Sequence, residues 1–442
     1  MEIQLSDHFT YSRLIRFTVP SIIMMIFISI YGVVDGIFVS NFVGKTPFAA
    51  VNLIMPFCML LGAFGFMIGT GGSALVSKVL GEGDKEKANK IFSMLIYMSL
   101  AIGIVLTIFG CVFVRPISEF LGAEGEMLEH CVIYGRILLT ATAAFILQNE
   151  FQSFLITAER PKLGLWITVL AGCVNIVLDA LFVAIFKWGL VGAAVATVIS
   201  QVVGATVPMI YFIVSKNDTL RLTKPEFDGR AFLKTCTNGS SEMMTNVALS
   251  LVNILYNFQL IKIAGENGVA AYGVIMYINF IFISVFIGYS IGSAPIIGYH
   301  FGAENTLELK NLFKKSLVIM GLISLVMTVS GILLSNPLSK IFVGYDKILF
   351  EMTKRGFIIY SFSFLFIGIN IFASGFFTAL NNGVVSAAIS FLRTLLFQVV
   401  VVLVLPIFLG IDGIWLSIVV AELLAIAISI YFFVKMKKRY NY

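Results

Sequence analysis

The sequence predicts an all-α integral membrane protein in which twelve transmembrane helices form two six-helix lobes related by an internal parallel repeat. The chain has 442 residues, of which 59% are hydrophobic and only 12% are charged. In an ordinary soluble protein about 25% of the residues are charged. A soluble body with so few charges could not cover its surface, so lipid must cover much of it. This composition excludes a cytosolic enzyme, a secreted domain and a disordered chain.

Twelve apolar stretches are long enough to cross about 30 Å of hydrocarbon as helices. Six of them exceed 25 residues, so we expect some helices to tilt, kink or extend into water. The expected spans are 14–42, 47–79, 91–114, 129–158, 163–186, 190–214, 235–263, 269–299, 312–334, 351–379, 384–408 and 412–434.

The positive charges are distributed unevenly between the two ends of these spans. Of the 30 Lys and Arg residues, 20 lie at the N-terminus, in the even-numbered connections or at the C-terminus, and eight lie in the odd-numbered connections. Because cytoplasmic segments carry the excess of positive charge, both termini are expected to face the cytoplasm. Short basic runs between apolar stretches also argue against a nucleic-acid partner.

The chain aligns with itself at an offset of 221 residues, half its length. Gly44 then aligns with Gly265, and Pro116 with Pro337. The same offset recurs from residue 44 to residue 192, which is difficult to attribute to chance. We expect an N-lobe of residues 1–220 and a C-lobe of residues 221–442, related by an axis along the membrane normal. Two such lobes facing a central cavity are typical of an alternating-access transporter.

Few ionisable residues fall inside the expected spans. An ionised side chain at a helix centre costs about 2.5–3.5 kcal/mol, so each is a functional candidate. Asp35 and Asp179 are two of them, and Asn175 lies four residues before Asp179, on the same helix face. At the 221-residue offset, Asp35 aligns with Tyr256 and Asp179 with Val400. The first lobe therefore keeps oxygen ligands that the second lacks.

Thr197, in the next span, can approach the face that carries Asn175 and Asp179. Together with Asp35 these residues supply two carboxylates, an amide carbonyl and a hydroxyl. Two buried carboxylates share a proton readily, because like charge and desolvation both favour the neutral form. The same oxygens suit Na⁺. Alternatively, each polar group only hydrogen-bonds a neighbouring helix.

Four other charged residues within or near the spans have alternative or structural interpretations. Glu150 lies near the cytoplasmic end of its span, where it either remains solvated or faces the cavity and attracts a cationic ligand. Glu242 and Glu422 lie closer to the cytoplasmic face and are expected to be structural. Arg136 either pairs with a carboxylate or lies near the outer surface. The five cysteines show no metal-ligand spacing, so no cofactor is expected beyond a coupling ion.

Four segments resemble the multidrug and toxic compound extrusion (MATE) family over nearly the whole chain. They are Tyr31–Val39 (YGVVDGIFV), Gly81–Asp84 (GEGD), Thr157–Lys162 (TAERPK) and Asn175–Asp179 (NIVLD). The last segment, with Asp35, is similar to the prokaryotic DinF-like and MepA-like branch. The connection between spans 2 and 3 lacks the Asp-Arg-rich motif of major facilitator proteins, the main rival with twelve spans.

The resemblance implies a role for ten residues. The cation site would comprise Asp35, Asn175, Asp179 and Thr197, which would be metal ligands if the ion is Na⁺. Pro20 would mark where the first span bends when that site changes protonation. Residues lining the N-lobe drug cavity would be Tyr31, Tyr134, Gln148 and Gln152, with Glu150 adding a charge that some relatives lack.

The expected function is a cation-coupled antiporter, driven by H⁺, Na⁺ or both, which exports amphipathic and often cationic drugs. We expect it in the bacterial inner membrane as a monomer, with small-molecule substrates and lipid as its partners. One alternative is a flippase for a lipid-linked precursor, whose cavity would need several cations, whereas Arg136 and Arg393 are the only arginines within these spans. The second alternative is an integral-membrane enzyme or receptor. An enzyme should show a cluster of His, Cys or carboxylate side chains at an interface, and the sequence shows none.

Overall fold

The computed structural model describes residues 3–43, 45–214 and 219–442, and the side chains of residues 33, 35–41, 45 and 48 lie outside that description. Regular structure in the described ranges is entirely helical. The α-helices and two π-helices (η) are α1 (Tyr11–Phe42), α2 (Lys45–Gly81), α3 (Lys85–Phe120), α4 (Gly125–Thr140), α5 (Thr142–Thr157), α6 (Pro161–Asp179), η1 (Ala180–Ile185), α7 (Gly189–Val214), α8 (Gly229–Gly302), α9 (Thr306–Val343), α10 (Lys347–Ser361), α11 (Phe364–Ala379), α12 (Gly383–Phe391), η2 (Leu392–Phe397), α13 (Gln398–Leu409) and α14 (Ile411–Tyr440).

The described helices account for the twelve expected spans. Nine are individually long and apolar enough to cross a membrane, and two bent pairs, α4 with α5 at 55° and α10 with α11 at 49°, qualify together. The 74-residue α8 would be about 110 Å long if it were straight. Its backbone leaves the helical conformation at Gly265, where φ is 62°, a value that glycine adopts without a steric penalty. We therefore count α8 as two spans.

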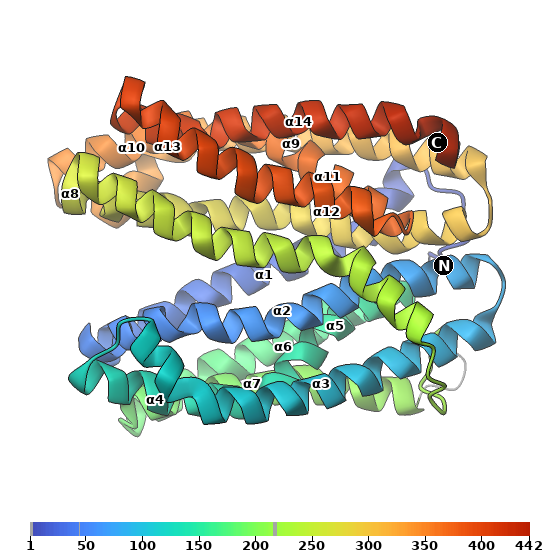
Figure 1. Cartoon of the computed structure of the whole chain (residues 1–442), viewed down its shortest axis with the longest axis horizontal. Helices are drawn as coiled ribbons and strands as arrows, with labels where there is room; N and C mark the ends of the chain where they lie inside the picture. The colour runs from blue at the N-terminus through green and yellow to red at the C-terminus, as the bar shows by residue number, and fades with distance from the viewer. Residues whose placement is uncertain (1–2, 44, 215–218) are drawn as a thin grey trace.

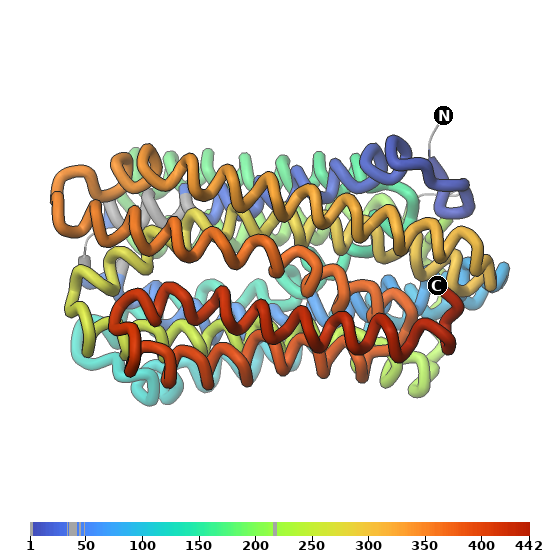
Figure 2. The backbone as a smooth tube through the Cα atoms, turned by 90° about the horizontal axis from the view of Figure 1, so that it is seen from above, coloured from blue at the N-terminus to red at the C-terminus, as the bar shows by residue number. Residues whose placement is uncertain are grey.

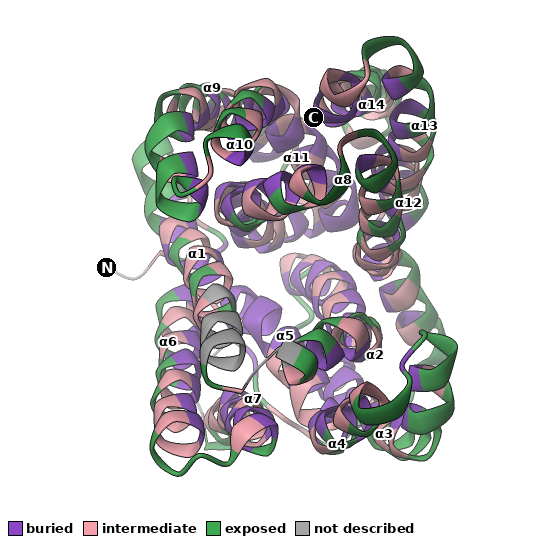
Figure 3. Ribbon diagram, turned by 90° about the vertical axis from the view of Figure 1, so that its left-hand side faces the viewer, coloured by how far each residue is buried: buried purple, intermediate pink, exposed green. Residues whose placement is uncertain are grey.

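The two halves of the chain occupy different sides of the molecule (Figure 1). Figure 3 shows α1 to α7 on one side and α9 to α14 on the other, and α1 and α2 both pack against α8. At one such contact, a Cβ added to Gly239 of α8 would collide with the carbonyl oxygen of Met67 in α2. The first described residues and the C-terminus lie at the same end of the bundle (Figure 2), as an even number of spans requires. The division at residue 220 and the orientation in the membrane stay predictions.

Each half contains one π-helix where the sequence predicted regular helix. A π-helix is a widened turn that rotates the residues beyond it, and such turns are frequent at functional sites. η1 follows Asp179 directly, and η2 contains Arg393. The 221-residue offset would place the counterpart of η1 at residues 401–406, whereas η2 covers 392–397. The internal repeat therefore does not extend to this detail.

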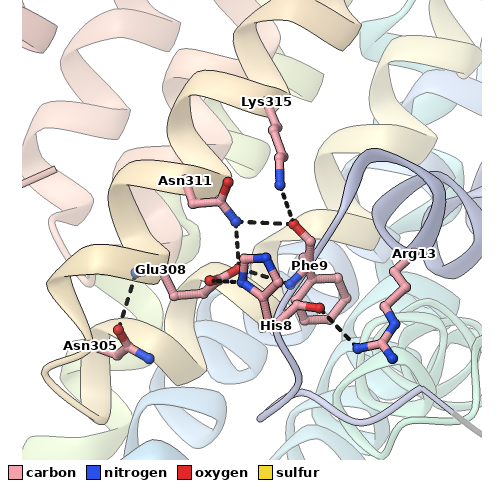
Figure 4. Close-up of polar contacts among 7 residues, drawn as sticks. All are labelled: His8, Phe9, Arg13, Asn305, Glu308, Asn311 and Lys315. Carbon is pink, nitrogen blue, oxygen red and sulfur yellow. Dashed lines mark hydrogen bonds and ion pairs between the residues drawn. The ribbon is translucent and has the colours of Figure 1, made fainter.

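The segment before α1 contacts both halves of the chain, and Figure 4 shows its contact with α9. Glu308, in the first turn of α9, accepts a hydrogen bond from the backbone amide of Phe9 at 2.9 Å and lies 2.6 Å from Nδ1 of His8. The backbone amide of Leu5 donates to the carboxylate of Glu159, at the turn between α5 and α6, at 2.6 Å. The segment thus contacts α9 of the second half and the α5–α6 turn of the first.

Candidate functional site

Helices α1 and α6 pack together and run in the same direction. A Cβ added at Gly164 would lie 3.9 Å from the sulfur of Met24. At Gly172, two turns further along α6, an added Cβ would lie 3.4 Å from Cδ1 of Tyr31 and closer still to the Phe27 ring. Because the contact moves toward the C-terminal end of both helices, they are parallel. Glycine at position 172 lets the aromatic rings of α1 lie directly on the α6 backbone.

Asn175 and Asp179 follow Gly172 on α6 and are both buried, with exposed fractions of 2% and 0%. The amide nitrogen Nδ2 of Asn175 has no hydrogen-bond partner among the described residues. A buried donor without a partner costs roughly 1–3 kcal/mol and calls for an explanation. Asp179 is the last residue of α6 before η1. The polar face predicted from the four-residue spacing is therefore present inside the first half of the chain.

The other two residues of the predicted cation site are Thr197 and Asp35, and the structure describes the side chain of Thr197 only. The Thr197 hydroxyl donates to the carbonyl of Ala193 in its own helix at 3.0 Å, which leaves its oxygen lone pairs available as ligands. Helix α7, which carries Thr197, packs beside α6. Asp35 lies in α1 one turn after Tyr31, but its side chain is outside the described residues. No group of three or more His, Cys, Asp or Glu side chains that could hold a metal occurs in the described part of the chain.

The expected polar cluster at residues 148–152 is divided between two sides of α5. A Cβ added at Gly204 of α7 would lie 2.7 Å from Cδ of Gln148, so Gln148 faces α7. Gln152, one turn later, lies on the same face and is buried. Glu150 faces away from both, because residues two apart on a helix point in different directions. This geometry therefore does not place Glu150 in the same cavity lining as Gln148 and Gln152.

Glu150 is completely buried between α5, α2 and α3. Its exposed fraction is 0%, and a Cβ added at Gly69 of α2 would lie 3.0 Å from its Cα. Ser99 of α3 is the polar side chain that approaches it. Neither carboxylate oxygen accepts a hydrogen bond of good geometry within the described part of the chain, so Ser99 is at most a weak partner. The sequence-based interpretation of Glu150 as a solvated carboxylate is therefore wrong.

The aromatic cavity candidates lie in different environments. Tyr31 is half-buried and packs on Phe27, with ring centroids 6.0 Å apart. Tyr134 of α4 is completely buried and belongs to an apolar cluster with Ile54 and Val114. Tyr134 thus packs in the core, whereas Tyr31 lies beside the polar face of α6.

Pro20 is buried within α1, which continues through it as one helix from Tyr11 to Phe42. A proline has no amide hydrogen, so the carbonyl of Arg16 lacks its usual helical hydrogen bond. This weakens the helix at that turn. A bend at Pro20 that follows protonation stays a prediction.

An ion pair in the second half was not predicted as a pair. Nε of Arg393, in η2, lies 2.8 and 2.9 Å from the two carboxylate oxygens of Glu422 in α14. Asn370 of α11 donates to the same carboxylate at 2.8 Å and accepts from the Ser429 hydroxyl at 2.8 Å. The sequence did carry a signal, since both charges fall within neighbouring spans. Glu422 was expected to be structural, and this pairing gives the physical basis for that role.

The two remaining charges within spans are less buried. Arg136 of α4 is exposed, and its position relative to the outer surface stays a prediction. Glu242, in the first part of α8, is half-buried and lies within electrostatic range of Arg393.

Comparison with known proteins supplies a family. The MatE family model matches residues 20–181 and 242–404. The multidrug export protein MepA of Staphylococcus aureus (strain MRSA252) is 24% identical over 93% of this chain and 91% of its own length. MepA of Staphylococcus haemolyticus (strain JCSC1435) is 25% identical over 81% of this chain and 80% of its own.

Solved structures show the same fold. An outward-facing multidrug resistance MATE family transporter of the MOP superfamily has a TM-score of 0.91 at 24% identity, covering 98% of this chain and 97% of that one. A MOP superfamily transporter from Pyrococcus furiosus, described as having a binding pocket of reverse polarity, has a TM-score of 0.90 at 24% identity, with the same coverage.

Proposed function

We propose that this chain, which belongs to the MatE family of membrane transporters, exports amphipathic organic compounds by exchange for a cation bound between α1 and α6. The family makes it a multi-pass transporter and not an enzyme. The coupling ion, the substrates and the residues that bind them are the proposed part.

The packing of α1 on α6 is the observation that carries the proposal. The two helices are parallel, and Tyr31 lies against Gly172. One turn beyond these residues, the α1 backbone at Asp35 is level with the stretch of α6 between Asn175 and Asp179, because both helices rise about 1.5 Å per residue. The carboxyl group of Asp179, the carbonyl oxygen of Asn175 and the carboxyl group that Asp35 contributes from α1 are oxygen ligands of the kind that suit a proton or Na⁺.

Coupling needs only that the cation and the substrate favour different conformations. A proton or Na⁺ at Asp35 and Asp179 would favour one state, and an organic substrate would favour the other. Thr197 adds a hydroxyl oxygen from α7. The π-helix directly after Asp179 and the weakened turn at Pro20 are local features that let α6 and α1 adjust when the site changes occupancy.

The substrates we propose are amphipathic and often cationic. The two MepA relatives named above are multidrug export proteins. Tyr31 offers an aromatic face beside the polar stretch of α6, which suits flat cations. We propose a monomer in the bacterial plasma membrane, with both termini cytoplasmic. The uneven distribution of Lys and Arg supports that orientation.

The alternative, a flippase for a lipid-linked phosphate, finds less support. Such a cavity needs unpaired cations. Of the two arginines within spans, Arg393 is paired with Glu422, which leaves Arg136 alone where several cations would be needed.

Dye uptake into inverted membrane vesicles, in which the cytoplasmic face points outward, tests the proposal. Asp35→Asn and Asp179→Asn should each reduce energised ethidium transport at least tenfold, because an amide cannot exchange a proton or neutralise Na⁺. Glu119→Gln, at an exposed carboxylate at the end of α3, should transport normally at matched expression. Transport at the normal rate by both aspartate variants would remove the site assignment. Headgroup translocation without dye transport by the wild-type protein would favour the flippase.

A further inference from the structure

A cavity of about 590 Å³ lies between the first turns of α1 and the start of α6, apart from the predicted cation site. It opens at the end of the bundle that carries both termini. Its lining includes Arg16, Phe17 and Pro20 from α1 and Lys162, Leu163 and Trp166 from α6.

Three cations line this cavity: Arg16 of α1, Arg160 directly before α6, and Lys162 of α6. Arg16 and Lys162 are both exposed, and neither forms an ion pair or hydrogen bond through its side chain with the described residues. Glu159, a carboxylate on the same lining, is already engaged by the Leu5 amide at 2.6 Å and the Thr219 hydroxyl at 3.2 Å. The three cations outnumber the one carboxylate of the lining, so the cavity carries a net positive charge.

The start of α6 adds to this positive potential. Its N-cap residue, Arg160, makes no side-chain capping hydrogen bond, and Pro161 occupies the first turn. Helix N-termini carry a partial positive charge and unpaired amides, which attract anions.

The lining changes from charged to apolar with depth. Trp166 follows Lys162 by one turn and is 68% exposed, and Phe17 and Pro20 follow Arg16 on α1. Tryptophan is enriched at the membrane interface, and basic residues lie on its cytoplasmic side. An amphipathic anion, with a phosphate at the end of the bundle and acyl chains along its apolar side, matches this gradient better than a free phosphate does.

The corresponding place in the second half is built differently. At the 221-residue offset, Arg16 aligns with Thr237 and Lys162 with Gly383. Gly383 lies directly on α8, since a Cβ there would collide with the Thr237 carbonyl oxygen. The start of α12 is capped, because the side chain of Asn382 accepts from the Val385 amide at 3.3 Å. The fold therefore does not require cations or an open helix start at this position.

We propose that this cavity is a binding site for an anionic phospholipid of the cytoplasmic leaflet. The phosphate lies between Arg16, Lys162 and the start of α6, and the acyl chains pass Phe17 and Trp166. Pro20 lines the same cavity, so the bound lipid touches α1 at its weakened turn. The site does not depend on the proposed coupling ion.

Native mass spectrometry of the purified full chain in detergent tests this site. The probes are dioleoylphosphatidylglycerol and, as the zwitterionic comparison, dioleoylphosphatidylcholine. Each basic residue near an anionic lipid strengthens binding about fivefold, so the double variant Arg16→Gln/Lys162→Gln should bind phosphatidylglycerol roughly 25-fold more weakly. The matched control Lys310→Gln/Lys314→Gln removes two exposed cations from α9 at the same end of the bundle and should bind it normally.

An equal loss in both double variants, or no preference for phosphatidylglycerol in the wild type, would overturn the site. Stabilisation against heat by inorganic phosphate as large as that by phosphatidylglycerol would show a free-anion site instead. If the double variant fails to fold, a photoactivatable phosphatidylglycerol is applied to the wild-type protein. It should label the peptide containing residues 161–166, and labelling confined to other peptides would contradict the proposal.

Discussion

Arg393 and Glu422 form a buried ion pair that joins η2 to α14, with Nε lying 2.8 Å from one carboxylate oxygen and 2.9 Å from the other. Asn370 donates to the same carboxylate from α11, so three helical segments share one polar contact. Inside an apolar bundle this contact fixes how the segments are rotated relative to one another.

Removing one partner of this pair should be costly. Glu422→Gln leaves the Arg393 charge buried without a counterion, which typically costs about 3–5 kcal/mol. We expect a clear fall in the unfolding temperature of the purified protein, and a recovery when Arg393→Met is combined with Glu422→Met. Arg355→Gln removes an ion pair with Asp412 in which Arg355 is 70% exposed, so it should change stability by less than about 1 kcal/mol. Equal effects of the two single variants would contradict the buried role.

The contact of α1 with α6 can be tested at Gly172. Gly172→Ala places a methyl group against the Phe27 ring, so α1 must move away from α6. We expect energised dye efflux to fall at least fivefold while expression is retained. Gly273→Ala is the matched control, because a Cβ there meets no atom within 4 Å. Normal efflux by Gly172→Ala would show that transport does not depend on this close packing.

Glu150 should be dispensable for transport. Both of its carboxylate oxygens are buried without a hydrogen-bond partner among the described residues, and its side chain points away from Gln148. Glu150→Gln keeps the shape and removes the cost of burying a charge. The unfolding temperature should stay the same or rise, and efflux should remain within twofold of wild type. Glu150→Lys, which introduces a fixed charge, should destabilise the protein. A folded Glu150→Gln variant without efflux would place Glu150 in the transport machinery.

The contact between the N-terminal segment and α9 should be visible in hydrogen exchange. Glu308→Ala removes the acceptor for the Phe9 amide and the partner of His8. A hydrogen bond to a charged group contributes about 1.5–3 kcal/mol, so exchange at Phe9 should be roughly 10- to 100-fold faster. Lys310→Ala, at an exposed position on the same helix, is the control. Unchanged exchange at Phe9 would mean that Glu308 does not hold the segment.

The spans were predictable because the bilayer itself imposes their length and apolar character. The break in α8 was also predictable. The repeat aligns Gly265 with Gly44, which lies between the first two expected spans, so a break between two spans was expected at Gly265. The four-residue spacing of Asn175 and Asp179 likewise predicted one buried polar face of α6.

Side-chain direction was harder to predict, because it depends on how each helix is rotated about its axis. The resemblance identified positions near a cavity, but it did not show that Glu150 faces α2 and α3 while Gln148 faces α7. The rotation of α4 about its axis likewise determines that Tyr134 is buried in the core, which its position in the sequence did not show. The pairing of Arg393 with Glu422 also depends on η2, whose widened turn has no signature in the apolar pattern.

We propose that the polar face of α6 binds the coupling cation. The most direct test of this proposal is efflux from proteoliposomes in which proton and sodium gradients are imposed separately, comparing wild type with Asp179→Asn. We predict that at least one gradient drives ethidium efflux by the wild type. Asp179→Asn should still bind ethidium but should respond to neither gradient. Gradient-driven efflux by Asp179→Asn at the wild-type rate would contradict the account.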